Sequence, residues 1–455
     1  MKKLTTPAAW GLGLALPAAL AWYYDVYVHW QPKLYPFAMA AVSVGVVLLT
    51  LLTLHTRGER KALCYVWKAA LSLAVFVGGI LLGIPLLVKE AFGRSTEQAA
   101  AVAIPLAAAQ VIVLFALLLR GKGKRKAGTA LLAAGLAIAA LGGAALWNLG
   151  GMTARYYRTR VLTTEGLASY EAVPGQTAIH FLNVSGDAIL LESGGKFALI
   201  DAGEDSDDPT GNPDLAYAGY EDYVLDYVKR ATGGRLDFIL GTHAHSDHLG
   251  GFDTLLADPD VAVGRAYLKR YHEHERFKYD YEYDWDNQEV YDQTLNALHT
   301  RGVPLIQDIP AEPFALGEFT LTFFNGEYDS APWDENDNSI CLLAEVFGQR
   351  VFLGGDLNDY GGKETRLAPQ IGKVDLLKAM HHGGEHSNTE AILSVLQPRT
   401  VIITNREIDL TDKWFLGPMR RFHQIAKAER IMCTGGFGGI VAVFGEDGIA
   451  YFACG

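Results

Sequence analysis

Five long apolar runs fill the first third of the chain and restrict what that part can form. Each run has about 20 residues, enough as a helix to cross the roughly 30 Å hydrocarbon core of a bilayer. Tryptophans and tyrosines gather near the ends of the runs, where interfacial anchors are expected. The predicted membrane-spanning helices are Pro7–Val28, Pro36–Leu54, Ala69–Val88, Ala99–Leu119 and Ala127–Leu149.

Lysine and arginine are distributed unequally between the loops that join these runs. The basic residues on the richer side are Lys2, Lys3, Arg57, Arg60, Lys61, Arg120, Lys122, Lys124, Arg125 and Lys126. The positive-inside rule places these loops in the cytoplasm, so the N-terminus lies inside and the chain after about residue 155 lies outside. Arg155, Arg158 and Arg160 count against this orientation but do not outweigh three basic loops. Bulky Trp22 and Tyr23 lie near the end of the first run, where a cleavage site would need small residues, so an uncleaved helix is expected.

We therefore predict a five-helix transmembrane domain at 1–155 and an extracytoplasmic domain at 160–455, in a multi-pass protein of the cell membrane. The whole chain has a formal net charge of −12, which must fall mainly on the second part because the first is net basic. An acidic exterior argues against broad adhesion to DNA or anionic lipid, and no sequence-specific DNA binding is expected. It does not exclude a phosphate-ester substrate, because bound cations dominate the field of their own site. The lipid bilayer and such a substrate are the expected partners, and the oligomeric state stays open.

Short apolar stretches alternate with stretches of helical spacing through the second part. The predicted strands are Thr177–Val184, Ala188–Glu192, Phe197–Asp201, Leu236–Leu240, Phe319–Phe324, Ser339–Phe347, Arg350–Leu353, Val374–Met380, Thr400–Thr404, Ile440–Phe444 and Ala450–Phe452. The predicted helices are Tyr217–Lys229, Asp286–Thr300, Asp359–Ala368, Thr389–Leu396 and Met419–Lys427. This order predicts an α/β fold with two sheets whose outer faces are covered by helices.

Four potential metal ligands lie within six residues, directly after the predicted strand that ends at Leu240. His243 and His245 point to the same side of an extended chain, because side chains two apart do so. Asp247 and His248 then project from the first turn of a helix. Imidazole nitrogens and carboxylate oxygens suit Zn²⁺, with Mn²⁺ or Fe possible.

Two further groups of candidate ligands follow later strands. The strand that ends at Leu353 is followed by two glycines and Asp356. The glycines let the backbone approach closely, so that the carboxylate can reach into a crowded site. The strand that ends at Met380 is followed by His381 and His382. Because all these ligands follow strands of one domain, the sequence predicts a site for two divalent metal ions.

Together these motifs resemble the metallo-β-lactamase superfamily, and within it the branch of ComEC-type metallo-hydrolase domains from competence DNA-uptake channels. The resemblance covers most of residues 177–404. The matching stretches are Phe181–Val184, Gly186–Ala188, Leu199–Gly203, His243–Gly251, Asn336–Ser339, Leu353–Asp356 and His381–Gly383. The resemblance implies an αββα sandwich, fused here to the multi-span N-terminal region.

The resemblance also implies roles for the candidate residues. The implied ligands are His243 and His245 for one cation, Asp247, His248 and His382 for the second, and Asp356 as the bridge. Asp247 would also orient a metal-bound hydroxide, and His381 would donate to a substrate oxygen or leaving group. Which of His381 and His382 is the ligand stays open. Asn338 is expected to contact substrate.

The chain departs from the superfamily pattern in two respects. A third histidine for the first cation is missing from its usual place; His272 and His274 lie nearby, in the charged aromatic insertion Arg270–Trp285. This insertion is interpreted as a lid, a membrane-proximal surface or an aromatic cage for a quaternary ammonium group. Five spans are also too few for a full uptake channel, so DNA translocation is not expected.

Asp201 and Thr242 are expected to orient the metal ligands through hydrogen bonds, without binding a metal themselves.

Three functions stay open. The first is a membrane-anchored metal-dependent hydrolase, a phosphoesterase or phosphodiesterase that acts on nucleic acid or on an envelope polymer such as phosphocholine-bearing teichoic acid. The second is a metallo-hydrolase of another bond, such as a lactone, thioester or β-lactam. The third is a non-enzymatic transport-accessory protein of DNA uptake.

The cysteines leave two alternatives in the last segment of the chain. Cys433 and Cys454 either form a disulfide, which an extracytoplasmic domain permits, or stay as two unpaired thiols. No cysteine spacing suggests a zinc site.

Overall fold

A computed structural model covers the chain and describes residues 154–206, 219–271, 286–329, 332, 334–410 and 413–454, with single positions 126, 130, 133 and 134. The chain divides into two compact units, Met1–Arg155 and Tyr156–Gly455. The five predicted membrane-spanning helices belong to the first unit, almost wholly outside the described residues, and stay a prediction. Within the described residues, no helix is both long enough and apolar enough to cross a bilayer.

Eight strands of the second unit form one sheet, in the order β1-β17-β16-β15-β14-β13-β12-β11. They are β1 (Leu162–Thr163), β11 (Phe314–Leu316), β12 (Phe319–Phe324), β13 (Cys341–Val346), β14 (Gln349–Leu353), β15 (Leu376–Lys378), β16 (Thr400–Ile403) and β17 (Arg430–Cys433). Strands β11 to β14 are antiparallel, whereas β14 to β17 are parallel. The parallel pairing sets Leu353 beside Lys378. The segments that follow β14 and β15 therefore start at the same edge of the sheet.

Nine strands form the second sheet, in the order β10-β9-β7-β5-β4-β3-β18-β19-β2. They are β2 (Ala168–Ser169), β3 (Thr177–Leu182), β4 (Ile189–Ser193), β5 (Lys196–Ile200), β7 (Phe238–Leu240), β9 (Ala266–Tyr267), β10 (Leu305–Ile306), β18 (Gly439–Gly445) and β19 (Gly448–Ala453). Strands β6 (Arg235–Leu236) and β8 (Ala262–Val263) make a separate pair. β5 and β7 run parallel, with Ile200 beside Leu240, so their following residues also share an edge.

The two sheets stack on each other and enclose the main core. Alternate residues of strands from both sheets point into it, among them Ile179, Phe181, Ile189, Leu191, Leu321, Phe323, Leu342 and Ala344. The outer face of the second sheet carries a separate apolar layer, to which Leu182 and Leu199 contribute. This layer packs against Val224 and Phe252 on the covering helices.

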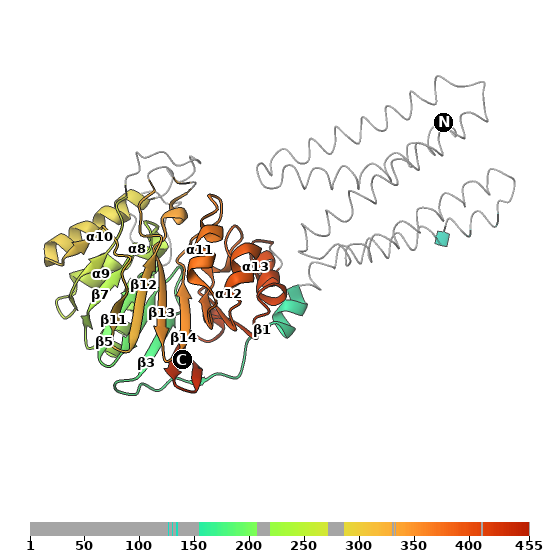
Figure 1. The fold of residues 1–455 in the computed structure, drawn as a ribbon, viewed down its shortest axis with the longest axis horizontal. Helices are drawn as coiled ribbons and strands as arrows, with labels where there is room; N and C mark the ends of the chain where they lie inside the picture. Colours follow the sequence, from blue (N-terminus) through green and yellow to red (C-terminus); the bar gives the residue numbers. More distant parts are fainter. Residues whose placement is uncertain are drawn as a thin grey trace, which may run out of the picture. The chain divides into compact units, whose positions relative to one another are not determined.

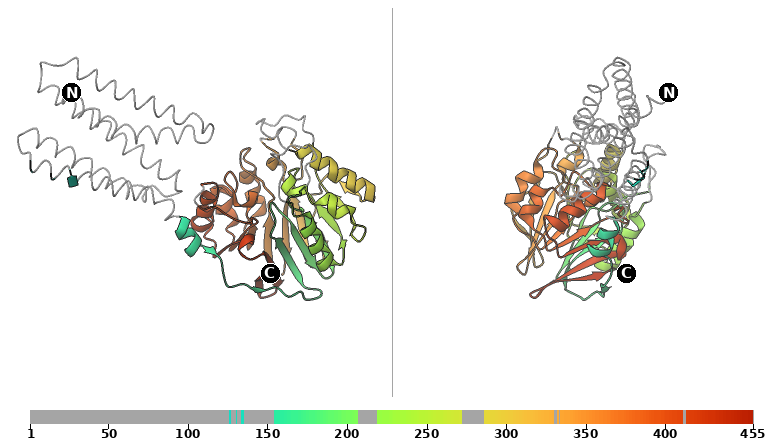
Figure 2. Two further views of the ribbon diagram at one scale, coloured as in Figure 1. Left: turned by 180° about the vertical axis from the view of Figure 1, so that it is seen from behind. Right: turned by 90° about the vertical axis from the view of Figure 1, so that its right-hand side faces the viewer.

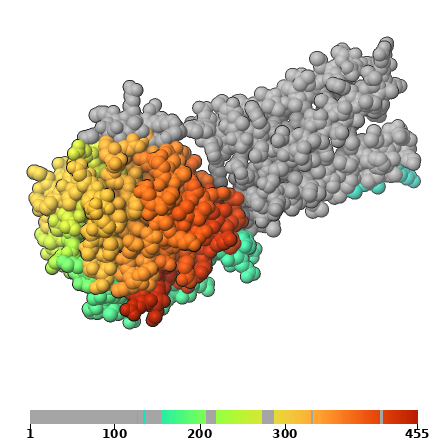
Figure 3. Space-filling view, viewed as in Figure 1, coloured from blue at the N-terminus to red at the C-terminus, as the bar shows by residue number. Residues whose placement is uncertain are grey.

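Helices cover the outer faces of both sheets (Figure 1, Figure 2). They are α7 (Glu221–Thr232), α8 (Ser246–Leu249), α9 (Phe252–Ala257) and α10 (Asn287–Arg301) on one side, and α11 (Lys363–Ile371), α12 (Glu390–Leu396) and α13 (Lys413–Gln424) on the other. In the space-filling view, residues coloured from yellow through orange to red pack as adjacent bands across this face of the unit (Figure 3). The predicted αββα sandwich is confirmed.

Each predicted strand and helix of the second unit has a counterpart, with ends displaced by a few residues. The predicted strand Leu236–Leu240 is divided between β6 and β7. Helix α13 begins at Lys413, six residues before the predicted start, and contains Pro418. Proline removes one backbone donor and disfavours a helix interior, which is why the sequence predicts a later start. The two-residue strands β8 and β9 were not predicted, because so short a stretch shows no periodicity.

The alternative of a disulfide between Cys433 and Cys454 is wrong for this structure. Both cysteines are free, and they belong to segments of different sheets. The Sγ of Cys433 donates to the carbonyl oxygen of Asn405 at 2.9 Å. The Sγ of Cys454 lies 3.2 Å from the hydroxyl of Tyr227, a residue of helix α7. The two thiols are therefore unpaired, as the second alternative holds.

Candidate metal centre

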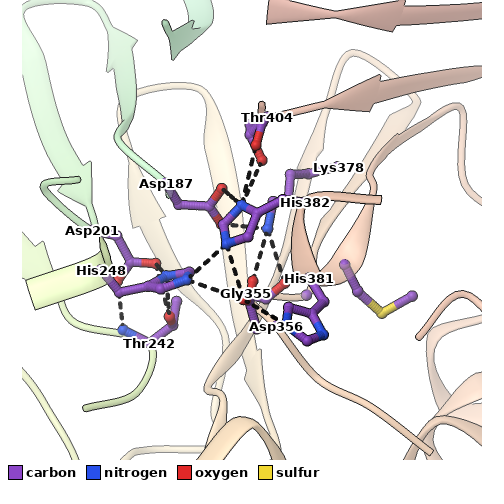
Figure 4. A network of polar contacts seen from close by, with 12 residues as sticks. Asp187, Asp201, Thr242, His248, Gly355, Asp356, Lys378, His381, His382 and Thr404 are labelled. Carbon is purple, nitrogen blue, oxygen red and sulfur yellow. Dashed lines mark hydrogen bonds and ion pairs between the residues drawn. The ribbon is translucent and has the colours of Figure 1, made fainter. Parts of the chain in front are cut away.

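Strand ends from both sheets deliver polar side chains to one place. Asp201 follows β5, and the His243–His248 stretch follows β7 and enters α8. Asp356 follows β14 in the other sheet, and His382 follows β15 within the 3-10 turn η5 (Met380–Gly383). Because each pair of parallel strands ends at one edge, stacking the two sheets brings Asp201, His248, Asp356 and His382 together (Figure 4).

Glycines permit the close approach of the backbone at this edge, as predicted. Gly355 has φ +55°, in the left-handed region that other residues avoid. A Cβ on Gly354 would lie 2.5 Å from the Cγ of Met380. A larger residue at either position would displace Asp356, the carboxylate that follows.

Three ligand atoms meet at the spacing that one tetrahedrally coordinated ion requires, and Asp247 brings a carboxylate oxygen beside them. His248 Nε2 lies 3.3 Å from His382 Nε2 and 3.2 Å from Asp356 Oδ2. His382 Nε2 lies 3.0 Å from Asp356 Oδ2 and 3.2 Å from Asp247 Oδ2. The other oxygen of Asp247, Oδ1, lies 3.7 Å from His248 Nε2. Ligands that bind zinc at about 2.0–2.1 Å are about 3.3 Å from one another, so these residues fit a divalent metal ion.

Two buried carboxylates orient the histidines of this group from outside. Asp201 Oδ2 lies 2.7 Å from His248 Nδ1, and its two oxygens accept from the Thr242 backbone N–H and hydroxyl at 2.7 and 2.8 Å. Asp187 Oδ1 lies 3.4 Å from His382 Nδ1, which also faces the carbonyl oxygen of Thr404 at 3.1 Å. With Nδ1 engaged, each imidazole turns its Nε2 toward the metal position (Figure 4).

Asp187 was not among the predicted site residues. Ligand atoms of Asp187, His248, Asp356 and His382 lie within 4.8 Å of one another, a grouping of three or more that occurs once among the described residues. Asp187 faces the Nδ1 rather than the Nε2 of His382, so we assign it to orienting that histidine. Its turn packs tightly on the motif: a Cβ on Gly186 would overlap the backbone of Asp247. The only feature of the sequence that could have indicated a role for Asp187 is its position directly after Gly186.

Lys378 is the second functional residue that the sequence did not reveal. Its side chain is fully buried, and its ammonium contacts the Asp187 carboxylate, donates to the Gly355 carbonyl at 2.9 Å and lies 3.4 Å from Asp356 Oδ1. Burial would lower the pKa of Lys378, but the two carboxylates outweigh it and raise the pKa. A lysine in a fully apolar strand was the available signal, because a buried charge needs a partner.

The ionisable groups of the site perturb each other strongly. Burial would lower the pKa of His248 and His382, but the surrounding carboxylates, Asp356 first, outweigh it and raise both pKa values well above the usual value. Protons and a metal therefore compete for the same Nε2 atoms. For His381, burial prevails and lowers the pKa to about 4. His381 is thus neutral at pH 7 and can donate one N–H hydrogen bond, but it is a poor reservoir of protons for a leaving group.

The backbone at His381 and His382 is strained in a way that aims both rings at the site. Both residues have φ +51°, which costs of order 1–3 kcal/mol for a residue other than glycine and persists where the surroundings impose it. His381 Nε2 lies 4.0 Å from Asp356 Oδ2, compared with 3.0 Å for His382 Nε2. The structure therefore places His382 at ligand spacing and His381 at the partly exposed side.

The predicted ligands of the other cation also lie together. His243 Nε2 is 3.0 Å from His245 Nδ1, and His243 Nδ1 is 3.0 Å from the Thr242 hydroxyl. The rings of His243 and His248 are 4.1 Å apart, so this pair borders the four-ligand group. His272 and His274 lie outside the described residues, as does nearly all of the aromatic insertion.

The structure does not bring Asn338 to the metal centre. Its side chain is buried in the 3-10 turn η4 (Glu335–Asn338), where its amide donates to Glu335 Oε2 at 3.0 Å. Its Oδ1 accepts from the Asp329 backbone N–H at 3.0 Å. Glu335 in turn accepts from the backbone N–H of Ala244, inside the His243–His248 stretch, at 3.3 Å. Asn338 therefore supports the metal motif through Glu335, and its contact with substrate stays a prediction.

We expect Asp201→Asn to lower the affinity for Zn²⁺ about 10- to 100-fold with little loss of folded protein. Asparagine tolerates the positive φ of this position, 56°, and can still accept from Thr242. The amide oxygen can keep the bond from the Thr242 backbone N–H, so the NH2 group replaces the oxygen that faces His248 Nδ1, and the histidine loses both the negative charge and this acceptor. Zinc titration against a competing chelator measures the change. Asp237→Asn is the matched control, because Asp237 also accepts from a backbone N–H, that of Phe197 at 3.0 Å, outside the centre. Equal affinity in wild type and Asp201→Asn would contradict the orienting role.

Comparison with known proteins agrees with this geometry. Residues 183–404 match the family model described as Metallo-beta-lactamase superfamily. The chain is 24% identical to ComE operon protein 3 of Bacillus subtilis (strain 168) over 217 residues, 48% of this chain and 25% of that protein. It is 26% identical to Recombination protein 2 of Haemophilus influenzae over 221 residues, 48% of this chain and 23% of that protein. The match thus spans about a quarter of the length of these curated relatives.

Solved structures show more distant likeness. Human tRNase Z, short form, is 15% identical with a TM-score of 0.30, covering 50% of this chain and 92% of its own. The metallo-beta-lactamase SMB-1 is 14% identical with a TM-score of 0.28, covering 47% and 81%.

Proposed function

Because residues 183–404 form a domain of the metallo-β-lactamase superfamily, we propose that the protein hydrolyses phosphate diesters with two bound divalent metal ions, most readily Zn²⁺. The observation that carries the proposal is the ligand spacing of His248, Asp356 and His382, with Asp247 beside them and the paired His243 and His245 next to them. Divalent ions at such a site lower the pKa of a bound water and stabilise charge on a phosphoryl group.

The residues at the partly exposed side of the site can bind an anionic ester and position it. The side chains of Asp247 and His381 are 26% and 23% exposed, compared with 2% for Asp356, so a substrate can approach from their side. Asp247 Oδ2 faces His382, and Oδ1, 3.7 Å from His248 Nε2, can accept a hydrogen bond from an attacking water. The neutral His381 ring can donate a hydrogen bond to an ester oxygen. Lys378, held behind Asp356, keeps that carboxylate charged and in place.

We expect the purified, zinc-loaded chain to hydrolyse bis(p-nitrophenyl) phosphate with a kcat/KM at least about ten times that for a chromogenic β-lactam. A phosphate diester offers two non-bridging oxygens to a pair of cations, whereas a carbonyl offers one. Both reactions are followed by absorbance under one set of conditions. A tenfold preference for the lactam, or for a lactone, would instead support hydrolysis of a carbon–oxygen or carbon–nitrogen bond. Metal binding without any hydrolysis would support the non-enzymatic, transport-accessory alternative.

We further propose that the catalytic unit lies outside the cell membrane, anchored by the five apolar runs. The support is the unequal distribution of lysine and arginine between the loops of the first unit. The substrate is then a nucleic acid or envelope polymer outside the cytoplasm.

Labelling of introduced cysteines tests this topology. In a background that carries Cys454→Ser, a membrane-impermeant thiol reagent should modify Glu171→Cys in intact cells but not Lys122→Cys. Glu171 is exposed on the second unit, and Lys122 lies in the most basic loop. Both sites should react after the cells are opened, which controls for access. The reverse pattern in intact cells would place the unit in the cytoplasm.

A further inference from the structure

Four aromatic rings lie in an unbroken row that starts at the metal centre. The ring centroids of His381 and Trp414 are 5.3 Å apart, those of Trp414 and His386 5.6 Å, and those of His386 and Tyr360 4.7 Å. The last pair is stacked, with 29° between the planes, and the other two are edge-on. We name these four residues the aromatic row.

The aromatic row is held in place by a loop under strain. His386 and Asn388 have φ of +70° and +58°, in addition to the two strained histidines before them. The Asn388 side chain exchanges two hydrogen bonds with the backbone of Met380, at 3.0 and 2.8 Å. Its backbone N–H donates to the buried Glu364 carboxylate at 2.6 Å. Strain of this kind persists only where several contacts impose it, and it gathers at functional sites.

Other contacts fix the two ends of the aromatic row. A Cβ on Gly384 would lie 2.5 Å from Trp414 Nε1, so the indole packs on the backbone of the metal loop because that residue is glycine. At the other end, the backbone N–H of Asp359, next to Tyr360, donates to the His386 carbonyl oxygen at 3.2 Å. The rings are therefore set before any ligand arrives, which lowers the entropic cost of binding.

The exposure and charge of the aromatic row indicate what it can bind. All four residues are partly exposed, which distinguishes them from the fully buried aromatic residues of the sheet core. The neighbouring carboxylate, Glu385, is paired with Arg421 at 3.0 Å. The other neighbouring carboxylate, Asp359, accepts from the backbone N–H and hydroxyl of Thr365 at 3.1 and 2.8 Å. Because both carboxylates have partners of their own, the row presents mainly ring faces and edges, which suits a flat ring.

We propose that the aromatic row is the subsite for a flat ring carried by the organic group of the phosphate ester. The protein then prefers phosphate esters of ring-bearing alcohols over open-chain polyol phosphates such as glycerol phosphate. The proposal rests on the proposed function, because the metal centre must hold the phosphate beside His381. Tyr360, His386 and Trp414 are specificity-determining residues in this arrangement and take no part in proton transfer.

Equilibrium binding of four monophosphates to the zinc-loaded, full-length chain tests the subsite. Thymidine 5′-monophosphate has a base and a sugar, phenyl phosphate only an aryl ring, ribose 5-phosphate only a sugar, and glycerol 3-phosphate no ring. All four give the metals the same phosphate group, so the ratio of Kd values reports the organic group alone. Stacking of one ring predicts that the two flat-ring ligands bind about 5- to 150-fold more tightly than glycerol 3-phosphate.

Substitutions then locate the preference on the aromatic row. Tyr360→Leu and His386→Leu should each reduce the Kd ratio of glycerol 3-phosphate to thymidine 5′-monophosphate at least about fivefold. Tyr223→Leu is the matched control, because Tyr223 is a partly exposed tyrosine on helix α7 that packs against Tyr227. In Tyr223→Leu, the Kd ratio of glycerol 3-phosphate to thymidine 5′-monophosphate should equal that of wild type.

Each outcome decides a different point. Equal Kd values for all four ligands, or equal losses of the ratio in Tyr223→Leu and Tyr360→Leu, would overturn the subsite and leave the proposed function standing. Binding of none of the four would overturn the proposed function and the subsite together. Tighter binding of only one flat-ring ligand supports the subsite and tells a nucleobase from a simple aryl group.

Discussion

The Asp356→Ala variant is expected to lose nearly all bound divalent metal and to hydrolyse phosphate diesters at least about 1000-fold more slowly in kcat/KM, about 4 kcal/mol. Asp356 is the carboxylate between the two histidines, with Oδ2 at 3.2 Å from His248 Nε2 and 3.0 Å from His382 Nε2. Its removal leaves these two imidazoles and the Lys378 ammonium facing one another without the intervening negative charge. Like charge at this spacing opposes the entry of a cation.

Metal content per chain by mass spectrometry and steady-state hydrolysis measure the two losses separately. Asp226→Ala is the control, because Asp226 is an exposed aspartate on helix α7. Wild-type metal content and activity in Asp356→Ala would sink the metal centre as assigned. Metal loss in both variants would point to damage unrelated to the site.

The Lys378→Met variant is expected to lower the melting temperature of the metal-free protein by about 5–8 °C. Methionine keeps the apolar stem but leaves two fully buried carboxylates, Asp187 and Asp356, without their ammonium partner. Breaking a buried ion pair on one side costs about 3–5 kcal/mol, which corresponds to such a shift in a domain of this size. A divalent cation replaces the lost charge, so zinc should raise the melting temperature of the variant more than that of wild type.

Thermal unfolding followed by circular dichroism, with and without zinc, measures both effects. Lys229→Met is the control, because Lys229 pairs with Asp258 and Asp260 at the surface and should change the melting temperature little. In the double variant Asp187→Asn with Lys378→Met, part of the loss should be recovered because one of the two unpaired charges is gone. An unchanged melting temperature in Lys378→Met would show that the lysine is not the partner of these carboxylates.

Secondary structure in the second unit was predictable wherever a segment was long enough to show its period. Strands such as β3 and β12, with six residues each, alternate or run apolar in a way that fixes their type. Strands β8 and β9 have two residues each and exist because a neighbour offers hydrogen bonds. Such pairing depends on the assembled sheet and leaves no trace in the local sequence.

The central residues of the candidate site were also predictable, because their positions follow from strand geometry. His243 and His245 share a side of an extended chain, and Asp356 and His382 follow parallel strands that end at one edge. The resemblance to the metallo-β-lactamase superfamily indicated the same candidate ligands, and the family model matches residues 183–404. These inferences need only the chain direction and the two-residue period of a strand.

The sequence by itself determined the αββα class and the candidate ligands that follow the strands, because both depend on local periodicity and on where strands end. Only the tertiary structure decided which partners those ligands have. Asp187 and Lys378 meet across the two sheets although 191 positions separate them in the chain. Asn338 turned inward to Glu335 instead of toward the metal centre. Contacts of this kind are set by how one sheet stacks on the other, and no local pattern of residues encodes that stacking.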